Sequence, residues 1–253
     1  MGHKIRLGGQ SPNQLASDSK LGPSPSVYGE GAGEAAAMME SSRLASYVAS
    51  RLCHDMASPL TSMMQSMELL FDDSLGAAMK VEGEKAMRSG LASLEAKIRY
   101  SRFAHGSQIL TINDNLANVA EAKDLVVKLF ATNSRTELDW KVETQRISYR
   151  QIRLLMNMTL IMIDPAARGV CHVSAKEQGD MLVLDVEARG QFSNFKSEVL
   201  DALAAKEPGG GWGGGAIQPY FTRVLAEEAG FSLEPRIVPQ AAGLAAVGKL
   251  AAA

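Results

Sequence analysis

Apolar residues in the first half of the chain recur every three or four positions and predict two long helices. Asp72, Asp73, Ser74 and Gly76 separate the two, and His105 with Gly106 ends the second. The spacing places each series on one stripe of a helix, the first about seven turns long, so the sequence predicts an antiparallel hairpin. The first stripe comprises Leu44, Val48, Leu52, Met56, Leu60, Met63, Met67 and Leu70, and the second Met87, Leu91, Leu94, Ile98 and Ser101.

A helical hairpin alone cannot cover both of its apolar stripes in water, because each helix contacts only one neighbour. Two hairpins that pair into a four-helix bundle would complete the core, so the sequence predicts a homodimer. The alternative is that the second half of the chain covers the stripe. Residues 1–40 have no sustained apolar period and are rich in Gly, Ser and Pro. We interpret them as a disordered tail or an expression remnant.

From residue 108 onward, helical and strand-like patterns alternate. Residues 138–142, 170–175, 181–188, 231–238 and 244–250 are predicted strands, the second and third joined by a turn at Gly179. Predicted helices cover 119–130, 149–163, 195–205 and 216–229. This mixed order predicts an α+β layer sandwich. The chain therefore divides into a tail at 1–40, a helical hairpin at 41–107 and an α/β domain at 108–253.

Composition excludes several classes of function. The chain has 253 residues with 26 Lys and Arg against 28 Asp and Glu, so no overall positive charge favours nucleic acid or an anionic membrane. No apolar run has the ~18 residues of a membrane span and no signal peptide is visible, so we expect a cytoplasmic protein. Neither Cys53 nor Cys171 lies in a C-x-x-C pair, and we expect both to be buried. With only four histidines and no clustered ligands, we expect no bound metal.

The most informative local pattern surrounds His54. Leu52 and Met56 lie on the apolar stripe, so His54, rotated by about 200° from each, should point into solvent. The adjacent Asp55 can keep one ring nitrogen protonated, which leaves the other as a nucleophile. Pro59 lacks a backbone N–H and crowds the carbonyl of Asp55, so we expect a kink one turn after His54. A solvated polar surface is the competing interpretation.

The run from His54 to Leu60, HDMASPL, resembles the phospho-acceptor motif of sensor histidine kinases, His-Glu/Asp-x-x-Ser/Thr-Pro-Leu. The later order of helices and strands resembles the ATP-binding domain of the same kinases. The fold that this resemblance implies is a dimeric four-helix bundle for dimerisation and histidine phosphotransfer, followed by a histidine-kinase-like ATPase sandwich. The resemblance covers the chain from about Leu44 to its C-terminus.

Three departures indicate that the ATPase-like domain is degenerate. In the kinases, an Asn a fixed number of residues before a proline holds magnesium. When the motif is aligned on Pro165, Thr159 stands at the position of that Asn, and Asn157 lies two residues before it. Ala188 stands where the kinases have the Asp that reads adenine, and Phe192 replaces a glycine. The resemblance therefore implies no ATP binding and no cofactor on this chain.

The glycine-rich run 209–215 superficially suggests a phosphate cradle. No lysine or metal ligand stands close to it in the sequence, and such runs are more often flexible connectors. We expect Trp212, in the middle of the run, to anchor the loop by packing on the sheet.

Arg51 to Pro59 is similar to the first helix of the ChpT-type histidine phosphotransferases of alphaproteobacterial phosphorelays, Arg-Leu-Cys-His-Asp-x-x-Ser-Pro. This resemblance implies a homodimer that relays phosphoryl groups between receiver-domain aspartates through His54, with Asp55 orienting it. The implied donor is the receiver of a CckA-like hybrid histidine kinase, the implied acceptors are CtrA-like and CpdR-like response regulators, and magnesium is expected on the receiver. The alternatives are an ATP-dependent sensor histidine kinase and a non-catalytic dimeric adaptor.

Four residues near His54 are candidate contacts for phosphate or a partner. Arg51 is one turn away, Ser58 and Pro59 belong to the motif, and Met64 lies off the stripe on an exposed surface. The second helix adds an excess of positive charge that would complement an acidic receiver face, although a solvated helix face is as good an explanation. Its six cations are Lys80, Lys85, Arg88, Lys97, Arg99 and Arg102, against the acids Glu82, Glu84 and Glu95.

Overall fold

The computed structural model describes residues 39–106, 116–132 and 136–251. Most of the predicted tail, residues 1–38, therefore lies outside the described residues, as does much of the connector, 107–115. The helices are α1 (Ser41–Phe71), α2 (Ala77–Ala104), α3 (Val119–Ala131), α4 (Tyr149–Met162), α5 (Ser197–Leu203) and α6 (Ile217–Glu228). The strands are β1 (Glu137–Val142), β2 (Val170–Gln178), β3 (Met181–Arg189), β4 (Ser232–Val238) and β5 (Ala241–Lys249). The predicted mixed α+β fold is confirmed.

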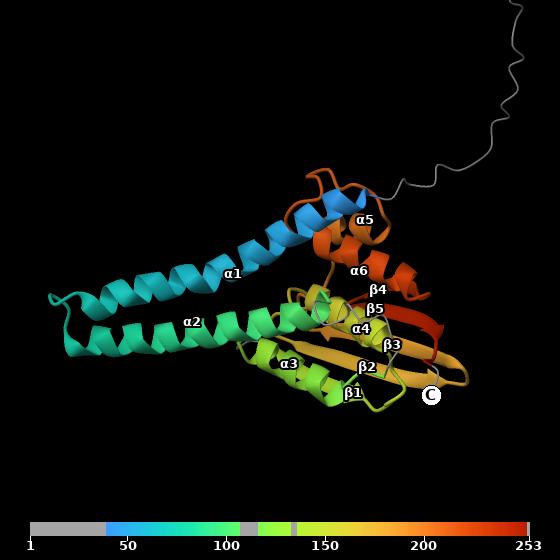
Figure 1. Ribbon diagram of the computed structural model, residues 1–253, viewed down its shortest axis with the longest axis horizontal. Coiled ribbons are helices and arrows are strands. Elements are labelled where there is room, and N and C mark those ends of the chain that lie inside the picture. The colour runs from blue at the N-terminus through green and yellow to red at the C-terminus, as the bar shows by residue number, and fades with distance from the viewer. Residues whose placement is uncertain (1–38, 107–115, 133–135, 252–253) are drawn as a thin grey trace, which may run out of the picture. The chain divides into compact units, whose positions relative to one another are not determined.

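Helices α1 and α2 form the predicted hairpin (Figure 1). Two buried glycines of α2, Gly83 and Gly90, allow the helices to approach closely. A Cβ atom at Gly90 would lie 2.5 Å from Cγ of Met63, and one at Gly83 would lie 3.2 Å from Cβ of Leu69. Each glycine thus makes room for a side chain of α1, which fixes the register of the hairpin.

Part of the apolar surface of the hairpin stays exposed in the single chain. Leu60 and Met67 of α1 are 49% and 46% exposed, although the sequence places both on the stripe. On α2, Leu91 and Ile98 are 56% and 38% exposed. The α/β domain therefore does not cover the whole stripe, contrary to the alternative interpretation of the sequence.

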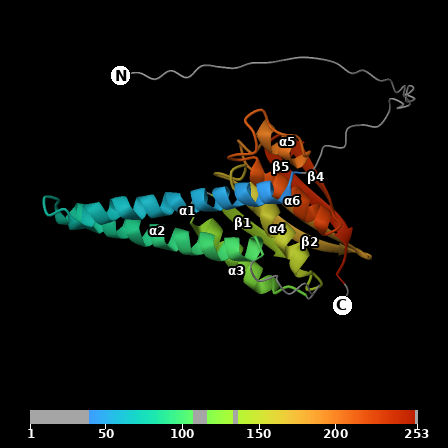
Figure 2. The ribbon, with the colours of Figure 1, turned by 45° about the horizontal axis from the view of Figure 1, so that its top comes forward.

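The α/β domain contains one five-stranded sheet in the order β1-β2-β3-β5-β4. β1 is parallel to β2, and the other neighbouring strands are antiparallel. Alternate residues of β3, from Leu182 to Ala188, are fully buried, as are Cys171 and Val173 of β2. They lie on the face of the sheet that α4 and α6 cover, with α4 against β3 and β5 and α6 against β4 (Figures 1 and 2). This face forms the main core, as the period-2 pattern predicts.

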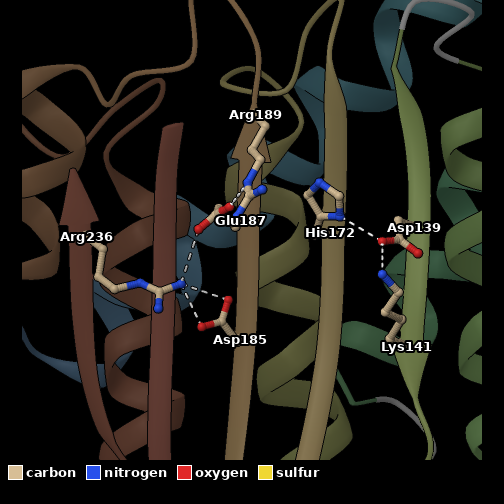
Figure 3. A network of polar contacts seen from close by, with 7 residues as sticks. All are labelled: Asp139, Lys141, His172, Asp185, Glu187, Arg189 and Arg236. Carbon is tan, nitrogen blue, oxygen red and sulfur yellow. Dashed lines mark hydrogen bonds and ion pairs between the residues drawn. The ribbon is translucent and has the colours of Figure 1, made fainter. Parts of the chain in front are cut away.

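The opposite face of the sheet carries paired charges (Figure 3). Arg236 of β4 reaches across to Asp185, with 2.6 Å between Nη2 and Oδ2, and to Glu187, which also pairs with Arg189. Further along the sheet, His172 and Lys141 both contact Asp139, and hydrogen bonds from them hold the pKa of this carboxyl below its usual range. His172 thus belongs to a network of polar contacts on the sheet surface.

A second, smaller core joins the glycine-rich loop to α1. The ring of Trp212 lies 4.5 Å from that of Tyr220 on α6, and both side chains are buried with Leu44 and Val48 of α1 packed against their cluster. The prediction that Trp212 packs on the sheet is wrong, because its side chain is buried in a cluster with residues of α6 and α1. The glycine-rich loop is therefore held against the N-terminal part of α1.

Among the described residues, no helix has the combination of length and apolar character that a membrane crossing needs.

Candidate functional site

His54 lies on the outer surface of α1, as the sequence predicts. Its side chain is 83% exposed, whereas Leu52 and Met56 on either side are half-buried. Cys53 is exposed as well, so the prediction that it is buried is wrong: a stripe through Leu52 and Met56 turns both residues 53 and 54 outward. Ser58, one turn after His54, is also exposed.

Asp55 connects the histidine to a cation. Its Oδ1 lies 3.4 Å from Nδ1 of His54, and its Oδ2 accepts a hydrogen bond from Nε of Arg51 at 2.9 Å. An ionised carboxylate only accepts hydrogen bonds, so the histidine contact requires the hydrogen to be on Nδ1. Nε2 then carries the lone pair and faces solvent. An exposed, oriented nitrogen nucleophile is the result.

Arg51 also connects α1 to the glycine-rich loop. Its Nη1 donates to the backbone carbonyl of Gly214 at 2.8 Å, so the guanidinium has two partners inside the chain. The loop is separated from Arg51 by 163 positions, and no local sequence pattern signals this contact. Through this hydrogen bond, the glycine-rich loop of the α/β domain lies directly beside the turn of α1 that carries His54.

Pro59 does not interrupt α1, which is helical from Ser41 to Phe71. Pro59 itself is buried against α2, and its carbonyl faces Gly90. The carbonyl of Asp55, which the proline leaves without its helical donor, accepts a hydrogen bond from Nζ of Lys97 at 2.9 Å. Sequence reasoning counted Lys97 only as one of six cations on α2. The sequence did contain one signal for this contact: a proline inside a helix leaves the carbonyl four residues earlier, here that of Asp55, in need of another donor.

Met64 is 59% exposed on α1, as predicted. It lies beyond the proline and forms part of the apolar surface that also contains Leu60 and Met67. The structure does not bring Met64 into contact with the Arg51, Asp55 and Lys97 group, and its expected part in partner docking stays a prediction.

A cavity of about 520 Å³ lies between the hairpin and the α/β domain. Asp55 and Lys97 line it on the hairpin side, and Lys196 and Phe195 on the other. His105, at the end of α2, also lines it; burial lowers the pKa of this histidine, whose ring stacks on Phe221 at 5.5 Å. Neutral His105 thus serves as a packing residue.

Asn157 and Thr159, the two residues that the sequence compares with the kinases' magnesium-holding Asn, have hydrogen-bond partners inside the fold. The fully buried amide of Asn157 donates to the carbonyls of Ala104 and Arg153, each at 2.8 Å, and accepts from Gln218. The hydroxyl of Thr159 donates a hydrogen bond to the Leu155 carbonyl of its own helix. Neither residue lines the cavity, and in the described part of the chain no three acidic, Cys or His side chains gather as metal ligands.

Comparisons with known proteins find similarity to phosphotransferases. Residues 119–238 match the family of the histidine phosphotransferase C-terminal domain. The chain is 25% identical over 199 residues to the protein phosphotransferase ChpT of Brucella abortus (strain 2308), an alignment that covers 75% of this chain and 88% of ChpT. A solved bacterial phosphotransferase shares the fold, with a TM-score of 0.73 and 21% identity over 83% of this chain and 98% of that one.

In sequence and in fold, the chain is therefore similar to histidine phosphotransferases. Within this class the chain is similar to ChpT, and residues 119–238 match the histidine phosphotransferase C-terminal domain family.

Proposed function

We propose that this protein relays phosphoryl groups between receiver-domain aspartates and that Nε2 of His54 carries the group. The lone pair of Nε2 attacks phosphorus of an aspartyl phosphate, the N–P bond forms, and the P–O bond electrons return to the receiver's carboxylate. Nδ1 keeps its hydrogen, so the ring becomes positively charged, and the Asp55 carboxylate offsets that charge. Transfer to a second receiver reverses these steps.

The partners follow from this chemistry and from the resemblance. We propose the receiver of a CckA-like hybrid kinase as donor and CtrA-like and CpdR-like response regulators as acceptors, all in the cytoplasm. Magnesium in the receiver's acidic pocket would neutralise the phosphoryl oxygens. This chain supplies the nucleophile and its orientation, which are the main requirements that phosphoryl transfer sets for the histidine partner.

The observation that carries this proposal is the outward, carboxylate-oriented imidazole of His54. The test is incubation of the purified chain with a panel of phosphorylated receivers in the absence of ATP. We expect acid-labile, base-stable label on the chain, followed by its transfer to a second receiver. Absence of label with every receiver would contradict the function.

We expect no useful binding of magnesium-ATP. Asn157 and Thr159 use their polar atoms inside the fold, and Ala188 offers no carboxylate to adenine. Without such groups a site loses both orientation and specificity. Calorimetry should therefore show no saturable heat, and self-labelling from γ-labelled ATP should fail. Micromolar affinity or self-labelling would instead favour a sensor kinase.

We further propose that the protein is a homodimer through the α1–α2 hairpin. The support is the apolar surface that the single chain leaves exposed, including Leu60, Met67 and Leu91. Burial of a leucine-sized side chain contributes roughly 1.5–3 kcal/mol. Sedimentation at micromolar concentration should give twice 27.0 kDa, and a monomer would contradict the bundle.

Met67→Asp should dissociate this dimer, because an unpaired charge would enter an apolar seam. Met67 is 46% exposed in the single chain, so the chain itself should still fold. Gln65→Asp is the matched control: residue 65 is exposed and rotated by about 160° from Met67 on the helix. Equal dissociation by both variants would argue against this surface as the interface.

A further inference from the structure

The lysine that reaches from α2 to α1 has an unusual partner. Nζ of Lys97 donates to the backbone carbonyl of Asp55 at 2.9 Å. In an uninterrupted helix this oxygen accepts the N–H of the residue four positions later. That residue is Pro59, which has no N–H. The ammonium of Lys97 therefore takes the place of the missing backbone donor, at the turn that carries His54.

Other cations of α2 are used differently. Lys85, Arg88 and Arg99 each pair with a carboxylate three or four residues earlier on α2 itself. Such exposed pairs contribute little. Lys97 is half-buried, and in the part of the chain that the structure describes no ion pair joins it to a carboxylate. Its contact across the hairpin is thus a specific use of this side chain.

We propose that Lys97 is a positioning residue for phosphoryl transfer, a proposal that rests on His54 as the carrier. Asp55 is held at two points, its carboxylate by Arg51 and its carbonyl by Lys97. These two contacts fix the carboxylate that meets Nδ1 of His54 and therefore the direction of Nε2. Without Lys97 the Asp55 carbonyl has no donor in this turn, and the imidazole loses its fixed orientation.

The test is a double-mutant cycle between Lys97 and Pro59 in single-turnover transfer from a phosphorylated receiver. Lys97→Met should lower the maximal transfer rate about tenfold, within the range that small misplacements cost, with little change in the receiver concentration giving half-maximal rate. In a Pro59→Ala background the alanine N–H binds the Asp55 carbonyl. There Lys97→Met should change the rate less than twofold.

The cycle separates positioning from two other roles. If Lys97 contacted the phosphoryl group or the receiver directly, Pro59→Ala would not remove the effect of Lys97→Met, and our proposal would be overturned. If Lys97 served stability alone, the folded Lys97→Met protein would transfer at the normal maximal rate. Lys128→Met is the matched control, since it makes the same change at an exposed lysine of α3 that has no part in the proposed site, and it should leave the rate unchanged.

A second measurement needs no receiver. In the wild type, the ammonium protons of Lys97 should exchange slowly enough for detection by ¹⁵N NMR, because they are hydrogen-bonded and half-buried. Pro59→Ala should release the lysine and remove the signal. A fast-exchanging Lys97 ammonium in the wild type would overturn the proposal. Failure of the proposed function looks different: the wild type would take no label while this NMR signal persisted.

Discussion

His54→Ala should abolish label transfer from a phosphorylated receiver while leaving the protein folded and its oligomeric state unchanged. The variant removes the proposed nucleophile, and no other described histidine has an exposed ring next to an orienting carboxylate on the hairpin. The His54 side chain is 83% exposed, so the loss of its ring should cost little stability. The measurement is acid-labile, base-stable label on the chain, with sedimentation as a check on assembly.

His172→Ala is the matched control for this variant. His172 is partly exposed and also contacts a carboxylate, Asp139, but it lies on the open face of the sheet. We expect normal labelling of this variant. Label on His54→Ala at the wild-type rate would mean that both the residue and the proposed function are wrong.

Asn157→Leu should lower the free energy of unfolding by about 3 kcal/mol, the cost of removing several buried hydrogen bonds at once. Asn157 is fully buried and joins α4 to the end of α2, through the carbonyl of Ala104, and to α6, through Gln218. Leucine has a similar size but leaves the Gln218 amide without this partner. Urea unfolding followed by fluorescence reports on this domain, because Trp140 and Trp212 both belong to it.

Thr159→Val is the matched control on the same helix. The Thr159 hydroxyl bonds only the Leu155 carbonyl of its own helix, so the change should cost about 1 kcal/mol or less. A loss for Asn157→Leu no greater than for Thr159→Val would contradict the structural role assigned to Asn157. It would also reopen the question of a ligand for this amide.

Most elements of the fold were predictable because each is amphipathic over its whole length. The 3.6-residue period gave α1, α2 and α4, and the period of two gave β2 and β3 within a few residues. The prediction for β5 began three residues late, at Leu244 rather than Ala241. Small residues precede Leu244, and they carry too little apolar signal to mark the start of a strand.

The site was predictable only where it depends on neighbours along the helix. The outward direction of His54 follows from its angle to Leu52 and Met56, and this part of the prediction is confirmed. The Lys97 and Gly214 contacts lie 42 positions from Asp55 and 163 from Arg51. They depend on the register of the hairpin and on how the loop packs, which no local period encodes.

The two cysteines differ in a way that makes the protein convenient for spectroscopy. Cys171 is buried in β2, and burial raises the pKa of its thiol to about 12, so it stays protonated and unreactive. Cys53 is exposed and adjacent to His54. A maleimide fluorophore would therefore attach at one natural position beside the proposed phosphorylation site, where its emission would respond to an arriving receiver without any engineered residue.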